Sequence, residues 1–264
     1  MRGRSVMKIL VCIKQILDPD CPVRIHSSGK WIEPDSHGLY RMNRFDEFAL
    51  EEALRLREAF PGTWVDALSV GPERAAQTVR RALELGADEG IHILLDDERY
   101  RMPWETASRI AAYAGNKRYD LILAGVMAED DMQGQVGPMV AEIMGYSSAT
   151  AVMSQKLIPD DNRIYVEREL EGGHREAFTL TLPALLSVQS GINRPRYPTL
   201  SHVLRARSQK LITIAAKTWN PPAPRDHIVC LVEPAPVKSS VFLSGSPLEK
   251  AEKLVKILRE NAWL

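Results

Sequence analysis

A glycine-bearing loop that joins a predicted strand to a predicted helix is the segment of this sequence best suited to binding chemistry. The apolar run 120–124 is typical of a buried strand, and residues 139–144 have the composition of a helix. Gly134 and Gly137 lie between them and let the backbone come close to a ligand. Backbone N–H groups and the N-terminus of a helix meet at such a junction and favour a phosphate. The loop therefore predicts a nucleotide before it predicts any catalysis.

Three acids in the same loop, Glu129, Asp130 and Asp131, do not suit contact with a phosphate, because like charges repel. We expect the backbone amides to hold the phosphate while an acid caps the helix or meets a ribose hydroxyl. An ordinary strand-to-helix loop with a capping aspartate explains the same residues. The spacing is neither Walker A nor GxGxxG, so the loop alone leaves both interpretations open.

Two further segments end predicted strands and point to the same place. Ser69-Val70-Gly71-Pro72 closes one strand, and Cys12 lies near the end of the first. In a doubly wound sheet the carboxyl ends of neighbouring strands line one crevice, although unrelated turns would leave the same pattern. Cys12 is a weak candidate for a nucleophile, because a cysteine in a strand is usually a small apolar filler.

Motifs of hydrolases and metalloproteins do not occur in the sequence. The six histidines are scattered without HxxxH or HExxH spacing, and there is no GxSxG and no CxxC. His92 lies in an apolar strand and is expected to be a hydrogen-bonded core residue. Asp130 and Asp131 could hold Mg²⁺ beside a phosphate, but helix capping is the favoured role. We therefore expect no metal site and no catalytic acid–base pair.

A basic segment forms a third candidate site. Residues 193–200 read Asn-Arg-Pro-Arg-Tyr-Pro-Thr-Leu and lead into residues 201–207, which add two more arginines. Two prolines make the segment rigid, and arginine, tyrosine and apolar anchors favour interfaces. The segment is either a docking surface for an acidic partner or a solvated charged loop.

The composition limits the class of protein. The chain has 264 residues, 45% of them apolar, with 34 Lys+Arg against 34 Asp+Glu. A net charge of zero argues against a nucleic-acid binder. The three cysteines suggest no disulfide framework and fit a reducing compartment, for which we expect the cytoplasm. No apolar run reaches the roughly 20 residues of a membrane span, and the basic start, residues 1–6, is interpreted as a short overhang.

The elements that must position these residues alternate in type. Strands are predicted at 7–13, 64–70, 91–95 and 121–124, and helices at 43–60, 73–85, 103–114 and 136–144. This alternation predicts a parallel sheet with right-handed crossovers. Residues 23–25 and 30–32 are predicted to form a hairpin on the edge of the sheet. In the first helix Asn43 is the expected N-cap, and Glu47, Glu51 and Arg55 lie opposite the apolar stripe.

The pattern changes from about Thr150. Strands joined by turns are predicted at 151–157, 163–170, 176–182 and 184–188. A proline-rich stretch after residue 214 (Pro221, Pro222, Pro224, Pro234, Pro236) predicts an extended arm. The arm ends in an amphipathic helix, 247–258, whose stripe of Leu248, Ala251, Leu254, Val255 and Leu258 must be buried on a partner subunit or on the parent domain.

Three motifs together resemble the β subunit of electron transfer flavoproteins. They are the helix start 42–53 (MNRFDEFALEEA), the loop 128–138 and the segment 193–200, with support from 8–15, 85–88 and 166–173. The match runs in order from about residue 7 to residue 214. The resemblance implies a Rossmann-like, three-layer α/β/α fold of the adenine nucleotide α-hydrolase-like type, in a nucleotide-binding domain 1–214. It also implies that residues 215–264 form an arm and helix that wrap an α subunit.

The same resemblance implies an electron carrier and not an enzyme. The α subunit would hold most of the FAD site, and this chain would hold AMP as a structural nucleotide. Phe45 also falls where the family places an aromatic residue near the flavin. Carried over by position, the residues expected at the cofactors are Cys12, Asn43, Phe45, Val70, Val126, Ala128, Asp131, Gln133, Gly134, Gln135, Val136 and Gly137.

The segment that ends at Leu200 resembles the family's recognition loop, in which a leucine anchors in an acyl-CoA-type dehydrogenase. Tyr197, Arg205 and Arg207 would complete this docking surface, and a quinone oxidoreductase would be an electron acceptor. Some relatives bind a second FAD in place of AMP and bifurcate electrons, and their loop carries Asp-Gly-Asp-Thr where this chain has residues 129–132, Glu-Asp-Asp-Met. AMP is therefore favoured. The alternative from another class is a stand-alone adenine-nucleotide-binding protein or ATP-dependent enzyme.

Overall fold

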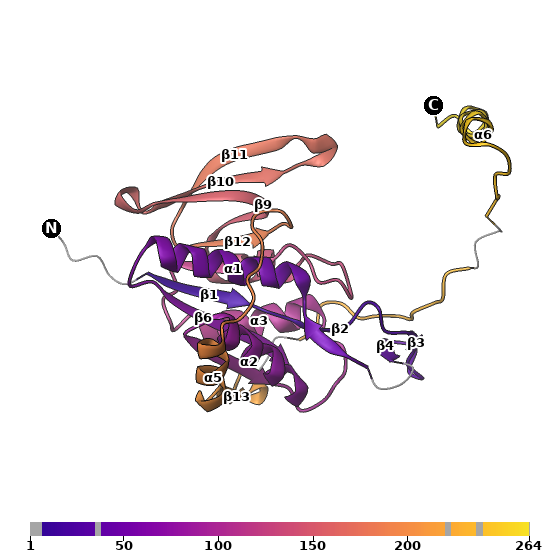
Figure 1. The fold of residues 1–264 in the computed structure, drawn as a ribbon. Coiled ribbons are helices and arrows are strands. Elements are labelled where there is room, and N and C mark those ends of the chain that lie inside the picture. The colour runs from indigo at the N-terminus through magenta and orange to yellow at the C-terminus, as the bar shows by residue number, and fades with distance from the viewer. Residues whose placement is uncertain (1–6, 35–37, 220–222, 236–239, 264) are drawn as a thin grey trace. The chain divides into compact units, whose positions relative to one another are not determined.

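A nine-stranded sheet forms the centre of the computed structural model, which describes residues 7–34, 38–219, 223–235 and 240–263 (Figure 1). The basic start and Pro221, Pro222 and Pro236 lie outside the described residues. From one edge to the other the strands are β11 (Arg175–Thr181), β10 (Arg163–Glu169), β9 (Ser147–Ile158), β12 (Ala184–Val188), β8 (Leu121–Gly125), β1 (Lys8–Cys12), β6 (Trp64–Gly71), β7 (Glu89–Leu94) and β13 (Ile212–Ala215).

The sheet is mainly parallel, as predicted. Every neighbouring pair from β9 to β13 runs parallel, and only β10 and β11 are antiparallel to their neighbours. The change of pattern near Thr150 therefore marks an antiparallel extension of the same sheet. His92 in β7 is buried and lies 3.0 Å from the carbonyl of Gly71 through Nε2, which confirms it as a hydrogen-bonded core residue.

Helices cover both faces of the sheet and give the three predicted layers. In β1, Ile9 and Val11 pack with residues of α1 (Arg44–Ala59) and α2 (Ala76–Leu85), whereas Leu10 and Cys12 pack with α3 (Pro103–Ala114) and α4 (Val136–Met144). This alternation follows from the two-residue period of a strand. The first turn before α2 is a short 3-10 segment, η1 (Glu73–Ala75). The α/β/α architecture is confirmed.

Glycines end two helices as the sequence predicts. Gly86 follows α2 with a φ of 129°, and Gly145 follows α4 in the left-handed region with a φ of 66°. Such conformations carry little steric cost only for glycine. Glu51, expected opposite the apolar stripe of α1, is buried and pairs with the guanidinium of Arg196.

The predicted hairpin forms, but its expected place is wrong. β3 (Val23–Ile25) and β4 (Ile32–Pro34) pair only with each other in a small antiparallel sheet. The edge beside β7 is occupied by β13, a strand that the sequence analysis missed. A second small sheet joins β2 (Gln15–Leu17) to β5 (Tyr40–Met42). The helix α5 (Leu200–Ser208), also not predicted, packs against α2.

The chain divides into two units, Met1–Leu231 and Val232–Leu264. The boundary expected after residue 214 falls inside β13, and residues 223–231 belong to the first unit. The second unit contains α6 (Pro247–Glu260), which begins with a capping box between Ser246 and Glu249. Its Leu248 and Leu254 are exposed. Within the described ranges, no helix has the length and apolar character needed to cross a membrane.

Candidate functional site

A cavity of about 180 Å³ opens in the first unit where the order of the strands reverses. The chain passes from β1 to β6 and β7 on one side, and β8 returns to the other side of β1. Cys12, Val70 and Gly125 lie at or beside the ends of β1, β6 and β8, and all three line the cavity. Ligands of open α/β sheets bind at such a reversal, outside the carboxyl ends of the strands.

Eleven of the twelve residues expected at the cofactors line this cavity. Phe45 is the exception: it is half-buried on α1, beside the backbone of Gly125. A Cβ added to Gly125 would lie 2.6 Å from Phe45 Cβ, so only glycine allows this approach. The eleven lining residues are Cys12, Asn43, Val70, Val126, Ala128, Asp131, Gln133, Gly134, Gln135, Val136 and Gly137.

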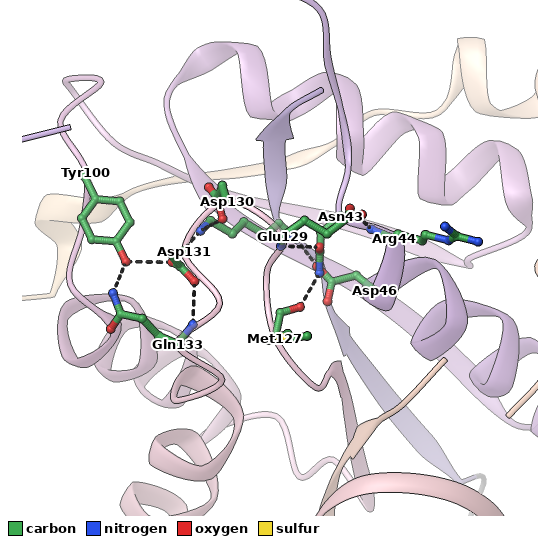
Figure 2. A network of polar contacts seen from close by, with 10 residues as sticks. Asn43, Arg44, Asp46, Tyr100, Met127, Glu129, Asp130, Asp131 and Gln133 are labelled. Atoms are coloured by element: carbon green, nitrogen blue, oxygen red, sulfur yellow. Dashed lines mark hydrogen bonds and ion pairs between the residues drawn. The ribbon is translucent and has the colours of Figure 1, made fainter. Parts of the chain in front are cut away.

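Asn43 stands at the N-cap position of α1, but the prediction that it caps the helix is wrong. Its side chain binds the loop instead: Nδ2 donates to the carbonyl of Met127 at 2.9 Å, and Oδ1 accepts the N–H of Glu129 at 3.1 Å (Figure 2). Glu129 accepts the N–H of Arg44, the first residue of α1, at 3.1 Å. An acid of the loop therefore caps a helix, but that helix is α1 and not the following α4.

The other two acids of the loop are held by Lys14. Its Nζ lies 2.7 Å from Asp130 Oδ1 and 2.9 Å from Asp131 Oδ2. Asp131 also accepts the hydroxyl of Tyr100 at 2.7 Å and the N–H of Gln133 at 3.1 Å (Figure 2). These contacts turn both carboxylates toward protein donors, so repulsion of a phosphate is reduced.

Asp130 and Asp131 share Lys14, but their pKa values shift in opposite directions. Burial raises the pKa of Asp130 despite the attraction of Lys14. Burial also acts to raise the pKa of Asp131, but Lys14, the Tyr100 hydroxyl and the Gln133 N–H together lower it below its ordinary value. Asp131 is therefore the firmer anion of the pair, because its charge meets three donors.

Two positions make the loop turn. Met132 and Gly134 adopt left-handed backbone conformations, with φ of 52° and 63°, whereas Asp130 does not. The backbone at position 130 therefore does not require glycine. A Cβ on Gly134 would lie 3.0 Å from the carbonyl oxygen of Val126, so glycine fits best there.

Asp46 is a buried acid of the site to which the sequence analysis gave no role. Its Oδ2 accepts the N–H of Lys14 at 2.7 Å and its Oδ1 accepts the N–H of Gly125 at 2.9 Å. The carboxylate thereby joins the chain after β1 to the end of β8 at the first turn of α1. Burial raises the pKa of Asp46 to about 7, against these two hydrogen bonds, which lower it.

Cys12 lies in the cavity wall without nucleophilic character. Burial, helped by the charge of Asp46, raises the pKa of its thiol to about 12. The reactive species of cysteine is the thiolate, which is scarce at neutral pH with such a pKa. Cys12 is therefore an apolar filler of the wall.

The start of α4 fits a phosphate. Val136 and Gly137 line the cavity at this terminus, and the N-cap residue, Gln135, makes no capping hydrogen bond with its side chain. Pro138 has no N–H to offer, so Val136 and Gly137 supply donors at the positive end of the helix. A Cβ on Gly137 would meet its neighbours only at ordinary contact distances, 3.4 Å and more, so packing alone does not require glycine at this position.

Comparison with known proteins gives the family. The profile of the electron transfer flavoprotein domain matches residues 35–219. The mitochondrial electron transfer flavoprotein subunit beta of Oryza sativa subsp. indica is 36% identical over 259 residues, covering 97% of this chain and 99% of the relative. The subunit beta of Sus scrofa is 32% identical over 262 residues, covering 96% and 97%. That of Bradyrhizobium diazoefficiens is 36% identical over 212 residues, covering 80% and 82%.

The chain belongs to the electron transfer flavoprotein family, as a β subunit. The resemblance found in the sequence motifs is thereby confirmed, and with it a role in electron transport as part of a flavoprotein.

In this electron transfer flavoprotein β subunit, the expected docking residues lie in and before α5. Tyr197 and Leu200 are 91% and 74% exposed. Arg205 is also exposed, but its Nη2 donates to the carbonyls of Leu83 and Ala87 at 3.2 and 3.0 Å, at the end of α2. Arg207 is exposed, and its side chain has no hydrogen bond or ion pair among the described residues.

An aromatic wall of the β-subunit cavity escaped the sequence analysis. Trp31, beside β4, stacks on Tyr100 with ring centroids 3.9 Å apart, and both rings line the cavity. The arm contacts the turn just before Trp31, where the N–H of Leu231 donates to the carbonyl of Gly29 at 2.7 Å. These residues come from three distant segments without a shared motif, so only the fold brings them together.

Metal binding finds no support in the part of the chain that the structure describes. No group of three or more His, Cys, Asp or Glu side chains there is arranged to hold an ion. Asp130 and Asp131, once weighed as Mg²⁺ ligands, are bound by Lys14.

Proposed function

We propose that this β subunit pairs with an α subunit in a heterodimeric electron carrier, and that it binds AMP as a structural nucleotide. FAD, held mainly by the α subunit, would supply the redox chemistry, so the chain itself is a carrier subunit and not an enzyme. The observation that carries the proposal is the cavity at the strand reversal, with eleven of the twelve expected residues in its wall.

In this proposal, different residues of the cavity have different roles in binding AMP. The N–H groups of Val136 and Gly137 would meet the phosphate at the start of α4. Asn43 would hold the loop in shape through Met127 and Glu129. Lys14 would keep the two aspartates of the loop neutralised.

The aromatic wall favours AMP over a second FAD. Trp31 and Tyr100 stack directly on each other, so no planar ring enters between them. Tyr100 is fixed further by its hydrogen bonds to Asp131 and Gln133, at 2.7 and 2.8 Å. A second FAD in place of AMP would bring a flavin ring in addition to its adenine, and the stacked pair leaves no room for that ring between its members, whereas AMP brings no such second ring.

The segment before α5 would dock the electron donor. In this proposal Leu200 anchors in an apolar pocket of an acyl-CoA-type dehydrogenase, with Tyr197 and Arg207 beside it. Electrons would pass on to a quinone oxidoreductase or another acceptor. The exposed Leu248 and Leu254 of α6 would bind the α subunit. The proposed function involves neither nucleic-acid binding nor membrane insertion.

The cytoplasm is the proposed location. Cys12, Cys21 and Cys230 are all free, which suits a reducing compartment. The mitochondrial name of the rice relative describes that protein. Fractionation of the source cells, with immunodetection of this chain, tests the assignment, and recovery in an organelle would contradict it.

Co-expression with an α subunit tests the proposal. The expected product is a stable yellow complex that accepts electrons from a reduced acyl-CoA dehydrogenase. A colourless monomer that hydrolyses ATP and ignores the α subunit would overturn it in favour of the stand-alone enzyme. Leu200→Ala should slow electron transfer from the dehydrogenase without changing the flavin content, and unchanged kinetics would remove the docking role.

A further inference from the structure

The segment 193–199 is held on α1 by its own side chains. It joins β12 to α5 and has no helix or strand of its own; Figure 1 shows it in orange, crossing α1. Arg196 makes the strongest contact: Nε lies 2.8 Å from Glu51 Oε2, Nη2 lies 3.0 Å from Glu51 Oε1, and its backbone N–H donates to Glu51 Oε2 at 3.2 Å. A bidentate ion pair of this kind fixes the orientation of the arginine as well as its distance from the carboxylate.

A second carboxylate of α1 completes the contact. Arg196 Nη1 lies 2.6 Å from Oε1 of Glu58, which stands two helical turns after Glu51. Hydrogen bonds to Glu51 and then Glu58 raise the pKa of the guanidinium further above its ordinary value, so its charge is constant at all physiological pH. Glu51 is only 7% exposed, whereas Glu58 is exposed to solvent. The buried carboxylate therefore supplies most of the restraint, because exposed pairs are screened by water.

Asn193 adds an independent tie on the same helix. Its Nδ2 donates to the carbonyl of Phe48 at 3.0 Å and to Oε2 of Glu52 at 2.9 Å. Glu52 in turn accepts the side chain of Gln155 from β9 at 2.9 Å. The segment is thus held at residues 193 and 196 by contacts to the buried acids Glu51 and Glu52. A solvated loop would not need such contacts.

The apolar anchors follow directly after these ties. Tyr197 is adjacent to Arg196, and Leu200 begins α5, where Thr199 caps the helix by accepting the N–H of His202 at 3.3 Å. Exposed Arg194 and Arg207 flank the anchors. A rigid apolar pair between two cations fits a partner with an apolar pocket and an acidic rim.

We infer that Arg196 and Asn193 are positioning residues that hold Tyr197 and Leu200 in a binding-ready arrangement for the dehydrogenase. The inference rests on the docking role given under the proposed function. Prior ordering matters because immobilising a side chain on binding costs conformational entropy, which lowers the affinity. Without the ties to Glu51 and Glu52, that cost would be met at every encounter with the partner.

The test compares Arg196→Ala, Arg196→Lys and Arg168→Ala in the purified heterodimer. Arg168 is the matched control, because its Nε pairs with Glu176 at 2.7 Å on the far edge of the sheet. The assay measures electron transfer from an acyl-CoA dehydrogenase reduced by its acyl-CoA substrate, over a range of heterodimer concentrations. Arg196→Ala should raise the KM for the heterodimer about tenfold, since 1.4 kcal/mol is a factor of ten. The kcat and the flavin content should not change.

If Arg196 only stabilised the fold, its replacement would not raise the KM while leaving the kcat unchanged. Arg196→Lys keeps the charge but loses the bidentate contact, so its KM should lie between those of the wild type and Arg196→Ala. Hydrogen exchange of residues 197–207 should quicken in the same order. If Arg196→Ala does not fold, Arg196→Lys and Glu58→Gln carry the test, with Glu58→Gln expected to be the milder.

The outcomes separate the inference from the function on which it rests. If Leu200→Ala raises the KM and the Arg196 variants do not, the positioning role is overturned and the docking role stands. If neither Leu200→Ala nor the Arg196 variants change the KM, the docking role fails with it. If Arg168→Ala raises the KM as much as Arg196→Ala, the effect is general destabilisation and the inference is wrong.

Discussion

Asn43 accepts the backbone N–H of Glu129 at 3.1 Å, so the residue at the cap position of α1 holds the loop whose acid caps that helix. Asn43, at the N-cap position, therefore binds the loop, whereas Glu129, a residue of the loop, caps the helix. The exchange ties the start of α1 to the nucleotide loop through two side chains, and a change in either one moves both. α1 also carries Glu51 and Glu52, which hold the docking segment. One helix therefore supports both proposed binding surfaces.

Replacement of Asn43 tests this tie. Asn43→Ala removes a donor to Met127 and an acceptor for Glu129, both in a part-buried setting. Leaving such groups unpaired costs about 1–3 kcal/mol, so AMP affinity should fall about 5- to 150-fold in calorimetric titration of nucleotide-free heterodimer. Asn261→Ala, at the exposed end of α6, is the control and should bind AMP normally. Unchanged affinity in Asn43→Ala would show that the loop keeps its shape without the tie.

Lys14 is expected to control the charge of the cavity. Lys14→Met leaves Asp130 and Asp131 without their shared cation, so two acids would face the phosphate. AMP should then be lost during purification at pH 8 and partly retained at pH 5.5, where protonation relieves the repulsion. Nucleotide released by acid and measured by chromatography gives the result. Equal retention at both pH values would refute the neutralising role.

Asp46 predicts a pH dependence of stability. Its folded pKa is raised from 3.8 to about 7, so between those values the folded chain keeps a proton that the unfolded chain releases. The contribution is present below pH 4 and is lost as the pH rises through 7. Relative to Asp46→Asn, the wild type should therefore lose a few kcal/mol of unfolding free energy between pH 4 and pH 7.5, measured by urea titration. Parallel pH curves for the two proteins would contradict this pKa.

The aromatic wall should control nucleotide release. Trp31→Ala removes the ring that stacks on Tyr100 and opens one side of the cavity. The rate of AMP release, followed by exchange with radiolabelled AMP, should rise several-fold while the flavin content stays constant. Trp64→Phe serves as the control, because Trp64 begins β6 at the end of the strand away from the cavity. A release rate like that of the wild type would mean that the wall does not retain the nucleotide.

The main elements of the fold were predictable because their periodicity is local. The helices 103–114 and 136–144 match α3 and α4 to the residue, since proline opens one and glycine ends the other. β13 was missed because its four residues are too few for a period to show. α5 was missed because its arginines suggested a solvated loop.

The cavity was predictable in outline and not in its contacts. Strand ends and glycines mark where backbone can meet a ligand, and this located Val70 and the loop 126–137. The partners of the acids depend on residues far away in the chain: Lys14 lies more than a hundred positions before Asp130, and Tyr100 comes from another loop. Asp46 carried no signal beyond its place in a helix turn, where an acid is ordinarily solvated.

The nucleotide content of the purified heterodimer tests the central claim most directly. Acid extraction followed by chromatography counts FAD and AMP per complex. The proposed function, with AMP behind the Trp31–Tyr100 wall, predicts one FAD and one AMP. Two FAD molecules and no AMP would contradict it and assign the cavity to a second flavin.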